Sequence, residues 1–171
     1  MQAIRENIVK AARSQLGVPY KKDTHMPGLA LDCVGLLGYA VEQASGYKID
    51  AESMKQGHNV TFTDLRLPRF LNSMGCTVRT YWQEAQAGDF VVWVYGPSVI
   101  HTGIVTGWKY EHTCQVIHCC AAFGKVVEHN LTGEWRAGRR LYGIYNIDGA
   151  IKRIADARTS QQTADDSSQQ Q

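Results

Sequence analysis

The stretch Leu31–Val41 reads Leu-Asp-Cys-Val-Gly-Leu-Leu-Gly-Tyr-Ala-Val and sets one cysteine, Cys33, where a loop containing Gly and Pro turns into an apolar helix. Asp32, the residue before it, is of a type that caps helix N-termini. The partial positive charge at a helix N-terminus lowers the pKa of a thiol, and the thiolate is the nucleophilic form. Backbone N–H groups of the first turn can also stabilise an oxyanion. The stretch therefore predicts a nucleophilic Cys33, which needs a base.

The composition is that of one globular domain followed by a polar tail. The chain has 171 residues, 44% of them hydrophobic and 20% charged, which is enough for a single sizeable core. We expect a domain over residues 1–150 and an extension over 151–171, disordered from about residue 159 because residues 159–171 contain only one hydrophobic residue. The formal net charge of +2 gives no indication of nucleic-acid binding.

The sequence contains no pattern typical of export or membrane insertion. Its first residues, Met1–Asn7, carry charges where a signal peptide would have its apolar region. No apolar run approaches the ~18 residues that a membrane span requires. Five cysteines without regular spacing do not form the pattern of a secreted disulfide framework. We therefore expect reduced thiols and no membrane insertion.

Hydrophobic periodicity predicts helices in the first part of the chain and strands in the second. Apolar residues recur at i+4 over residues 3–16 and form a second stripe over 33–45, and a short helix is predicted after Asp64. β-branched and aromatic residues then predict five strands, over residues 89–95, 99–107, 113–121, 124–130 and 140–147. Adjacent strands after a run of helices indicate an α+β fold with an antiparallel sheet of about five strands, or a small barrel.

Period-two geometry selects two of the six histidines as partners for Cys33. His101 shares a strand face with Val105, and His118 lies on an apolar face of the next strand. We expect both imidazoles to point at the helix that carries Cys33, with Gly103 leaving room for that helix. A Cys with a His base and a second polar group that orients the base is the general arrangement of an activated nucleophile. The other histidines are interpreted as solvated, or as bordering a turn or the sheet: His25, His58, His112 and His129.

The run from His112 to Cys120 also contains the residue types that bind zinc. Its spacing contains neither a C-x-x-C nor an H-x3-H pair, and strand alternation turns Cys119 away from Cys120. We therefore predict no metal site. The thiols interpreted as core or partly exposed residues are Cys76, Cys114, Cys119 and Cys120. Taken singly, Cys33 could also be a small core residue, but its combination with two histidines favours catalysis.

Five segments resemble, in order, motifs of the NlpC/P60 cysteine peptidases, papain-like enzymes that cut bacterial cell-wall peptides. Leu16–Tyr20 is similar to the family's L-G-x-P-Y, Leu31–Leu36 to its D-C-S-G-L nucleophile motif, and Gly88–Val91 to its G-D-hydrophobic strand start. His101–Val105 resembles H-V-G-I-Y, and Val116–His118 matches the strand that carries the family's third polar residue. Together the segments extend over residues 3 to about 147.

The resemblance implies a papain-like fold in which the helix of the nucleophile packs on the antiparallel sheet. It implies Cys33 as nucleophile, His101 as base and His118 as the residue that orients His101. Tyr20 would border the site, and Asp32 would help bind the amino end of the substrate. The implied substrate is a peptidoglycan stem peptide, often cleaved between D-glutamate and a diamino acid, and no cofactor is implied.

Two departures from the family pattern concern the substrate side. Val34 replaces the usual serine of D-C-S-G-L, and Lys21–Ala30 lacks the common W-G-G-like stretch. Members without a signal peptide and with D-C-x-G-L resemble phage tail-associated or gene-transfer-agent peptidases. That resemblance implies synthesis in the bacterial cytoplasm, transport on the virion to the cell wall, and tail proteins as partners. The alternatives are an inactive tail-tip or assembly protein, a thiol amidase or acyltransferase, and a zinc-binding module.

Overall fold

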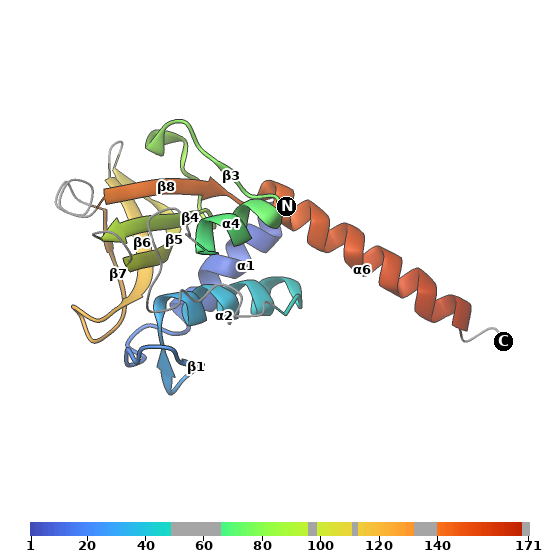
Figure 1. The fold of residues 1–171 in the computed structure, drawn as a ribbon, viewed down its shortest axis with the longest axis horizontal. Helices are drawn as coiled ribbons and strands as arrows, with labels where there is room; N and C mark the ends of the chain where they lie inside the picture. Colours follow the sequence, from blue (N-terminus) through green and yellow to red (C-terminus); the bar gives the residue numbers. More distant parts are fainter. Residues whose placement is uncertain (49–65, 96–98, 111–112, 132–139, 169–171) are drawn as a thin grey trace.

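The computed structural model describes residues 1–48, 66–95, 99–110, 113–131 and 140–168 (Figure 1). Within these ranges the helices are α1 (Gln2–Arg13), α2 (Cys33–Ser45), α4 (Arg66–Ser73) and α6 (Asp148–Ser168), with a 3₁₀ turn at Trp82–Glu84. The strands are β1 (His25–Met26), β2 (Ala30–Leu31), β3 (Thr77–Val78), β4 (Phe90–Tyr95), β5 (Val99–Tyr110), β6 (Thr113–Cys120), β7 (Lys125–Asn130) and β8 (Arg140–Asn146). Asp64, His58 and His112 lie outside the described residues.

The main sheet has six antiparallel strands in the order β3-β8-β4-β5-β6-β7. The predicted α+β fold is confirmed, and each of the five predicted strands is present. The sheet also contains one strand that was not predicted, β3, whose two residues pair with Tyr145 and Asn146 at the end of β8. A two-residue strand is too short for a period-two pattern to predict it. Three consecutive strands, β5, β6 and β7, form the part of the sheet that carries the histidines.

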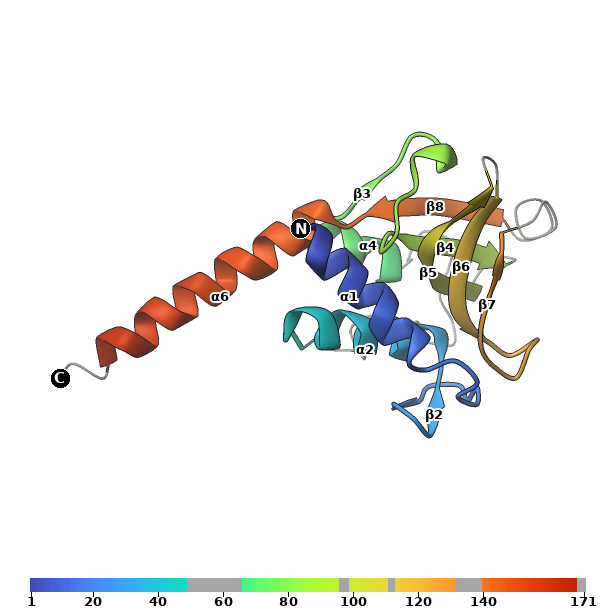
Figure 2. The same cartoon turned by 180° about the vertical axis from the view of Figure 1, so that it is seen from behind.

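Helices α1, α2 and α4 lie together against one side of the sheet (Figures 1 and 2). The core between the two layers is built from inward residues of the strands, such as Ile104, Ile117 and Cys119, and from apolar residues of the helices, such as Ala12 and Leu37. A second, smaller apolar cluster covers the other face of the sheet. Both faces of the central strands are therefore buried.

Helix α2 begins and ends where the sequence predicts. Asp32 is the N-cap, and its Oδ1 accepts a hydrogen bond from the N–H of Gly35 at 2.6 Å. Gly46 closes the helix in the left-handed conformation with φ 69° and donates its N–H to the carbonyl of Glu42. Gly35 is packed so closely that a Cβ there would lie 2.6 Å from the carbonyl oxygen of Thr24. The β1–β2 hairpin can thus lie directly against the first turn of α2.

A buried ion-pair network joins the start of α1 to the sheet. Arg5, 3% exposed, contacts the carboxylate of Asp89 at 2.8 Å and that of Asp148 at 2.8 Å. Asp89 is fully buried and also pairs with Arg79 at 2.5 Å. Asp89, at the Gly-Asp start of β4, therefore has a structural role, because its carboxylate joins α1 to the segment before β4, and Arg5 in turn joins α1 to α6.

Helix α6 differs from the composition-based expectation. The domain was predicted to end at residue 150, but Ile151 and Ile154 are buried in the main core. Disorder was predicted from about residue 159, whereas the described helix runs to Ser168 and projects away from the body (Figure 1). A helix already anchored by its first turns avoids the cost of nucleation, so polar residues can continue it. In the part of the chain that the structure describes, no helix combines the length and apolar character needed to cross a membrane.

Candidate active site

Cys33 occupies the first position of α2, as predicted, and its side chain is partly exposed. Its sulfur is within hydrogen-bonding reach of three backbone N–H groups, those of Thr102, Val34 and Cys33 itself. Thr102 follows His101 directly along β5. The first turn of α2 therefore places the thiol beside the strand that carries the predicted base.

Backbone N–H groups at the start of α2 lower the pKa of Cys33, as predicted, but other groups around the thiol outweigh them. The pKa of the Cys33 thiol is raised from 9.0 to about 12. Burial is the largest cause, and the nearby Asp32 carboxylate adds to it, whereas the three backbone N–H groups oppose it. The thiol is therefore neutral in this environment. It becomes a nucleophile only if a neighbouring group accepts its proton.

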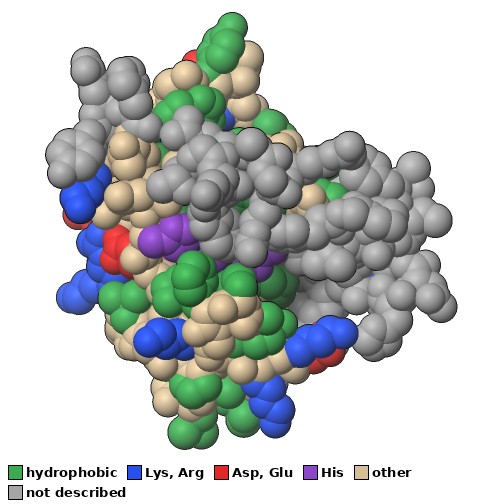
Figure 3. All heavy atoms as spheres, turned by 90° about the vertical axis from the view of Figure 1, so that its left-hand side faces the viewer, with side chains coloured by type: hydrophobic (Ala, Val, Ile, Leu, Met, Phe, Trp, Pro, Cys, Tyr) green, Lys and Arg blue, Asp and Glu red, His purple; other side chains and the backbone are tan. Residues whose placement is uncertain are grey.

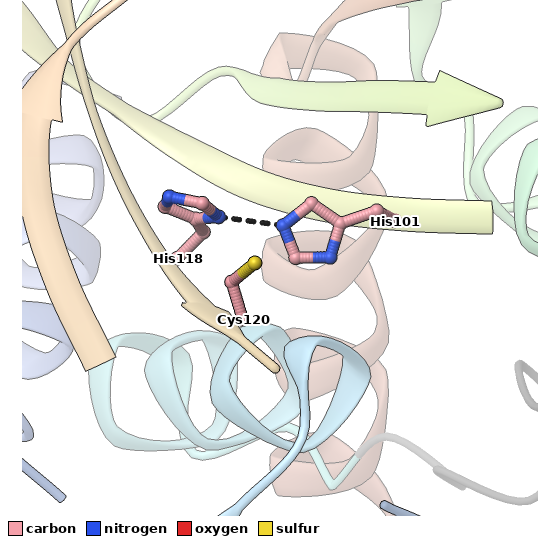
Figure 4. A group of neighbouring side chains, drawn as sticks. All are labelled: His101, His118 and Cys120. Atoms are coloured by element: carbon pink, nitrogen blue, oxygen red, sulfur yellow. Dashed lines mark hydrogen bonds between the residues drawn. The ribbon is translucent and has the colours of Figure 1, made fainter. Parts of the chain in front are cut away.

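His101 and His118 are brought together as a hydrogen-bonded pair. His101 Nε2 and His118 Nδ1 are 2.6 Å apart, and both side chains are buried (Figure 4). Trp93, fully buried on β4, stacks on the His101 ring with centroids 5.3 Å apart and an interplanar angle of 23°. The other ring nitrogen of His101 faces away from His118 (Figure 4). The hydrogen bond to His118 and the stacking on Trp93 thus fix the orientation of the His101 ring from two sides.

The two imidazoles share strand faces with Val105 and Val116, and the expectation that they point at α2 stays a prediction. Val105 and Val116, on the same strand faces as the histidines, belong to the second cluster and not to the helix-packed core. The space at Gly103 is filled by His118 and Trp93, since a Cβ there would lie 3.1 Å from the Cβ of His118. Alternation predicted which residues share a face, but it could not predict which face the helices cover.

Cys119 and Cys120 point to opposite sides of β6, as predicted. The thiol of Cys119 donates to the carbonyl of Leu31 at 3.1 Å, on the side of the helices. The Cys120 sulfur points towards the His101–His118 pair (Figure 4). Together His101, His118 and Cys120 offer a zinc-type donor set, with ligand atoms within 4.8 Å of one another. However, the two facing nitrogens are 2.6 Å apart, closer than the roughly 3.3 Å that two nitrogen ligands keep on a tetrahedral zinc ion. The arrangement fits a hydrogen bond better than a chelate.

His129 was missed as a member of the site. Its Nε2 lies 2.8 Å from His118 Nε2, and its Nδ1 lies 2.9 Å from the carbonyl oxygen of Asn130. The β6–β7 register pairs His129 with Val116 and His118 with Val127, so the two histidines are diagonal neighbours on one face. The predicted strands 113–121 and 124–130, paired as a hairpin with 121 opposite 124, have this same register, so pairing them would have found His129.

The remaining predicted site residues lie around Cys33. The pKa of the Tyr20 hydroxyl is raised by burial and then by the nearby Cys33 and Asp32, which places Tyr20 beside both. Asp32 is buried and serves as the cap. Substrate contacts of Tyr20 and Asp32 stay predictions. His25, expected to be solvated, is only partly exposed, and its buried Nδ1 is near the position that a Cβ of Gly35 would occupy.

Histidine side chains reach the surface near the middle of the face drawn in Figure 3, and hydrophobic side chains border them there. These residues form an arrangement in which a cysteine begins a helix and a histidine pair lies on two adjacent strands. Since His101 is 7% exposed, a substrate could approach the pair only at its edge.

Comparison with solved structures finds NlpC/P60 proteins at low sequence identity. NlpC1 of Trichomonas vaginalis is 16% identical with a TM-score of 0.55, over 83% of this chain and 44% of its own. The P60 domain of an antigen from M. avium subspecies paratuberculosis is 20% identical with a TM-score of 0.53, over 85% and 93%. A lipoprotein-like member of the NLP/P60 family from Staphylococcus aureus is 19% identical with a TM-score of 0.57, over 84% and 41%.

These comparisons show that the chain has the fold of NlpC/P60 proteins. The chain spans less than half the length of the Trichomonas and Staphylococcus proteins. No protein-family model matches the sequence, and no curated protein matches it.

Proposed function

We propose that the chain is a cysteine peptidase in which Cys33 is the nucleophile and His101 the base. The observation that carries this proposal is the placement of the Cys33 sulfur at the N-terminus of α2, hydrogen-bonded to the N–H of the residue that follows His101. The hydrogen bond from His101 to His118 supports the role of His118 in orienting the base. The NlpC/P60 fold supports the same class of reaction.

The raised pKa of Cys33 determines how the first step runs. The thiol is neutral, so no thiolate is formed before the substrate is attacked. His101 accepts the proton of the thiol as the sulfur attacks the scissile carbonyl. Backbone N–H groups of the first turn of α2 stabilise the oxyanion of the tetrahedral intermediate. His101 then donates the proton to the leaving amine, and water, deprotonated by His101, hydrolyses the thioester.

The test compares three alanine variants on purified bacterial sacculi. Cys33→Ala is expected to abolish digestion, and His101→Ala to reduce it more than His118→Ala, because His118 does not itself transfer the proton to the substrate. A thiol alkylator should abolish activity of the wild-type protein, whereas EDTA should not change it. Digestion by Cys33→Ala at the wild-type rate would refute the assignment of the nucleophile. Equal residual rates for the two histidine variants would refute the assigned roles.

The substrate we propose is a peptidoglycan stem peptide, cleaved between D-glutamate and a diamino acid. What supports it is the order of five family-like motifs in the sequence and the fold. Mass spectrometry of muropeptides after incubation with wild type and Cys33→Ala tests both the activity and the bond. New free amino groups on the stem peptides are expected from the wild type alone, and their absence would favour a transferase.

We also propose that a phage tail carries the protein to the cell wall. The support is the likeness of Asp32–Leu36 to the D-C-x-G-L motif of tail-associated members. Immunodetection of the chain in purified virions of a host lysate tests this proposal. Its absence from virions that contain their other tail proteins would overturn it.

A further inference from the structure

A chain of hydrogen bonds extends from His101 beyond His118 to the backbone of β7. His101 Nε2 contacts His118 Nδ1 at 2.6 Å, and His118 Nε2 contacts His129 Nε2 at 2.8 Å. The chain ends where His129 Nδ1 meets the carbonyl oxygen of Asn130 at 2.9 Å. It therefore crosses three adjacent strands, β5, β6 and β7, on one face of the sheet.

The carbonyl at the end of this chain determines which nitrogen of each neutral ring carries a proton. A carbonyl oxygen can only accept, so His129 Nδ1 carries hydrogen and donates to it. Neutral His129 then has an unprotonated Nε2, which must accept from His118 Nε2–H. His118 Nδ1 is consequently unprotonated and accepts from His101 Nε2–H. The unprotonated nitrogen of His101 is Nδ1, the one that can accept a proton.

The surroundings of His118 and His129 hold this arrangement in place. His118 is fully buried, so a Nε2–H without an acceptor would cost free energy. The ring of Phe123, in the turn between β6 and β7, packs edge-on to His118 with centroids 6.0 Å apart. It also lies 5.7 Å from the centroid of His129. The two ring–ring contacts partly shield the His118–His129 hydrogen bond from water.

We propose that His129 is a positioning residue that sets the tautomer of His118 and thereby leaves Nδ1 of His101 unprotonated. If His129 offered no acceptor, His118 could place its proton on Nδ1 and would then no longer accept from His101. His101 would lose the partner that keeps its own proton on Nε2. The consequence for catalysis rests on the proposed function, whereas the tautomers themselves do not.

Side-chain ¹⁵N NMR of the wild-type protein tests the tautomers directly. At mildly alkaline pH, where imidazoles are neutral, the spectra should show Nε2–H tautomers for His101 and His118 and the Nδ1–H tautomer for His129. In the variant His129→Leu the His118 signals should change from a single Nε2–H form to a mixture. A wild-type His129 in the Nε2–H form would overturn the proposal, whatever the activity.

Kinetics on a soluble muropeptide test the catalytic consequence. His129→Leu should lower kcat about tenfold, the effect of one lost hydrogen bond, and leave KM unchanged because His129 does not contact substrate. His129→Gln, whose amide oxygen can accept from His118, should retain more activity. Glu128→Gln, on the opposite face of β7 and paired with Arg13, is the matched control. Wild-type kcat in His129→Leu would overturn the proposal, while inactivity of the wild type would count against the proposed function alone.

Discussion

Replacing Asp32 with asparagine separates the charge of this residue from its capping role. Asp32 Oδ1 accepts the N–H of Gly35 at 2.6 Å, and asparagine caps helices as well as aspartate does. The carboxylate is, after burial, the next cause of the raised pKa of Cys33. Asp32→Asn should therefore lower the pKa of Cys33 from about 12 towards its ordinary value and keep the helix intact.

The structure bounds the size of this effect. A pKa of about 12 in place of 9.0 corresponds to a thiolate fraction about a thousandfold smaller at neutral pH. Burial, the larger cause, stays in the variant, so Asp32→Asn recovers only part of that factor. Asp32→Ala also loses the cap, which costs about 1 kcal/mol, or roughly 2–4 °C in Tm for a domain of this size.

The assay measures the rate at which iodoacetamide alkylates Cys33 at a series of pH values. Mass spectrometry of the peptide that contains Cys33 gives the alkylated fraction over time. Alkylation of Asp32→Asn should be faster than that of the wild type at every pH below the wild-type pKa. If Asp32 also binds the amino end of the substrate, KM for a muropeptide should rise in the same variant. An unchanged or slower alkylation rate in a folded Asp32→Asn protein would refute the reasoning.

Two further predictions concern stability. Arg5→Met removes one ion-pair partner of the fully buried Asp89 and should lower the free energy of unfolding by about 3–5 kcal/mol, roughly 6–20 °C in Tm. Arg13→Met breaks a partly exposed ion pair and should lower it by less than about 1 kcal/mol. Calorimetry of both variants checks the difference, and equal shifts in Tm would contradict it. Three thiols have pKa values raised to about 12, Cys33, Cys76 and Cys119. The contribution of these thiols to the free energy of unfolding is complete below their unfolded-state pKa and is lost as pH rises towards about 12. Between these pH values the folded chain binds more protons than the unfolded chain, so stability falls as pH rises. Urea denaturation at increasing alkaline pH should show this loss, and a Cys76→Ala variant should lose less; a flat profile would contradict the raised values.

Much of the fold follows from local patterns. Asp32 and Gly46 mark the limits of α2, and the predicted cap at Asp32 is confirmed. The five predicted strands are present, because runs of β-branched and aromatic residues bounded by turn residues favour strands. The tail was predicted less well, since composition does not reveal that Ile151 and Ile154 anchor a helix in the core.

The site depended more on contacts between distant segments. Cys33 and the two histidines could be selected from the sequence, since capping and strand alternation operate within a few residues. His129 was not selected, because its role appears only when the predicted strands 113–121 and 124–130 are paired with each other, which places it diagonal to His118. Trp93 likewise meets His101 only through the pairing of β4 with β5.

The sequence by itself determined that Cys33 begins a helix and that His101 and His118 each lie on the apolar face of a strand. Only the tertiary structure decided which face of the sheet the helices cover and which groups surround the thiol. The direction of the Cys33 pKa shift shows the physical reason. A helix N-terminus is a local feature that can be read from a few residues, whereas burial and the Asp32 charge act through the folded surroundings and outweigh it.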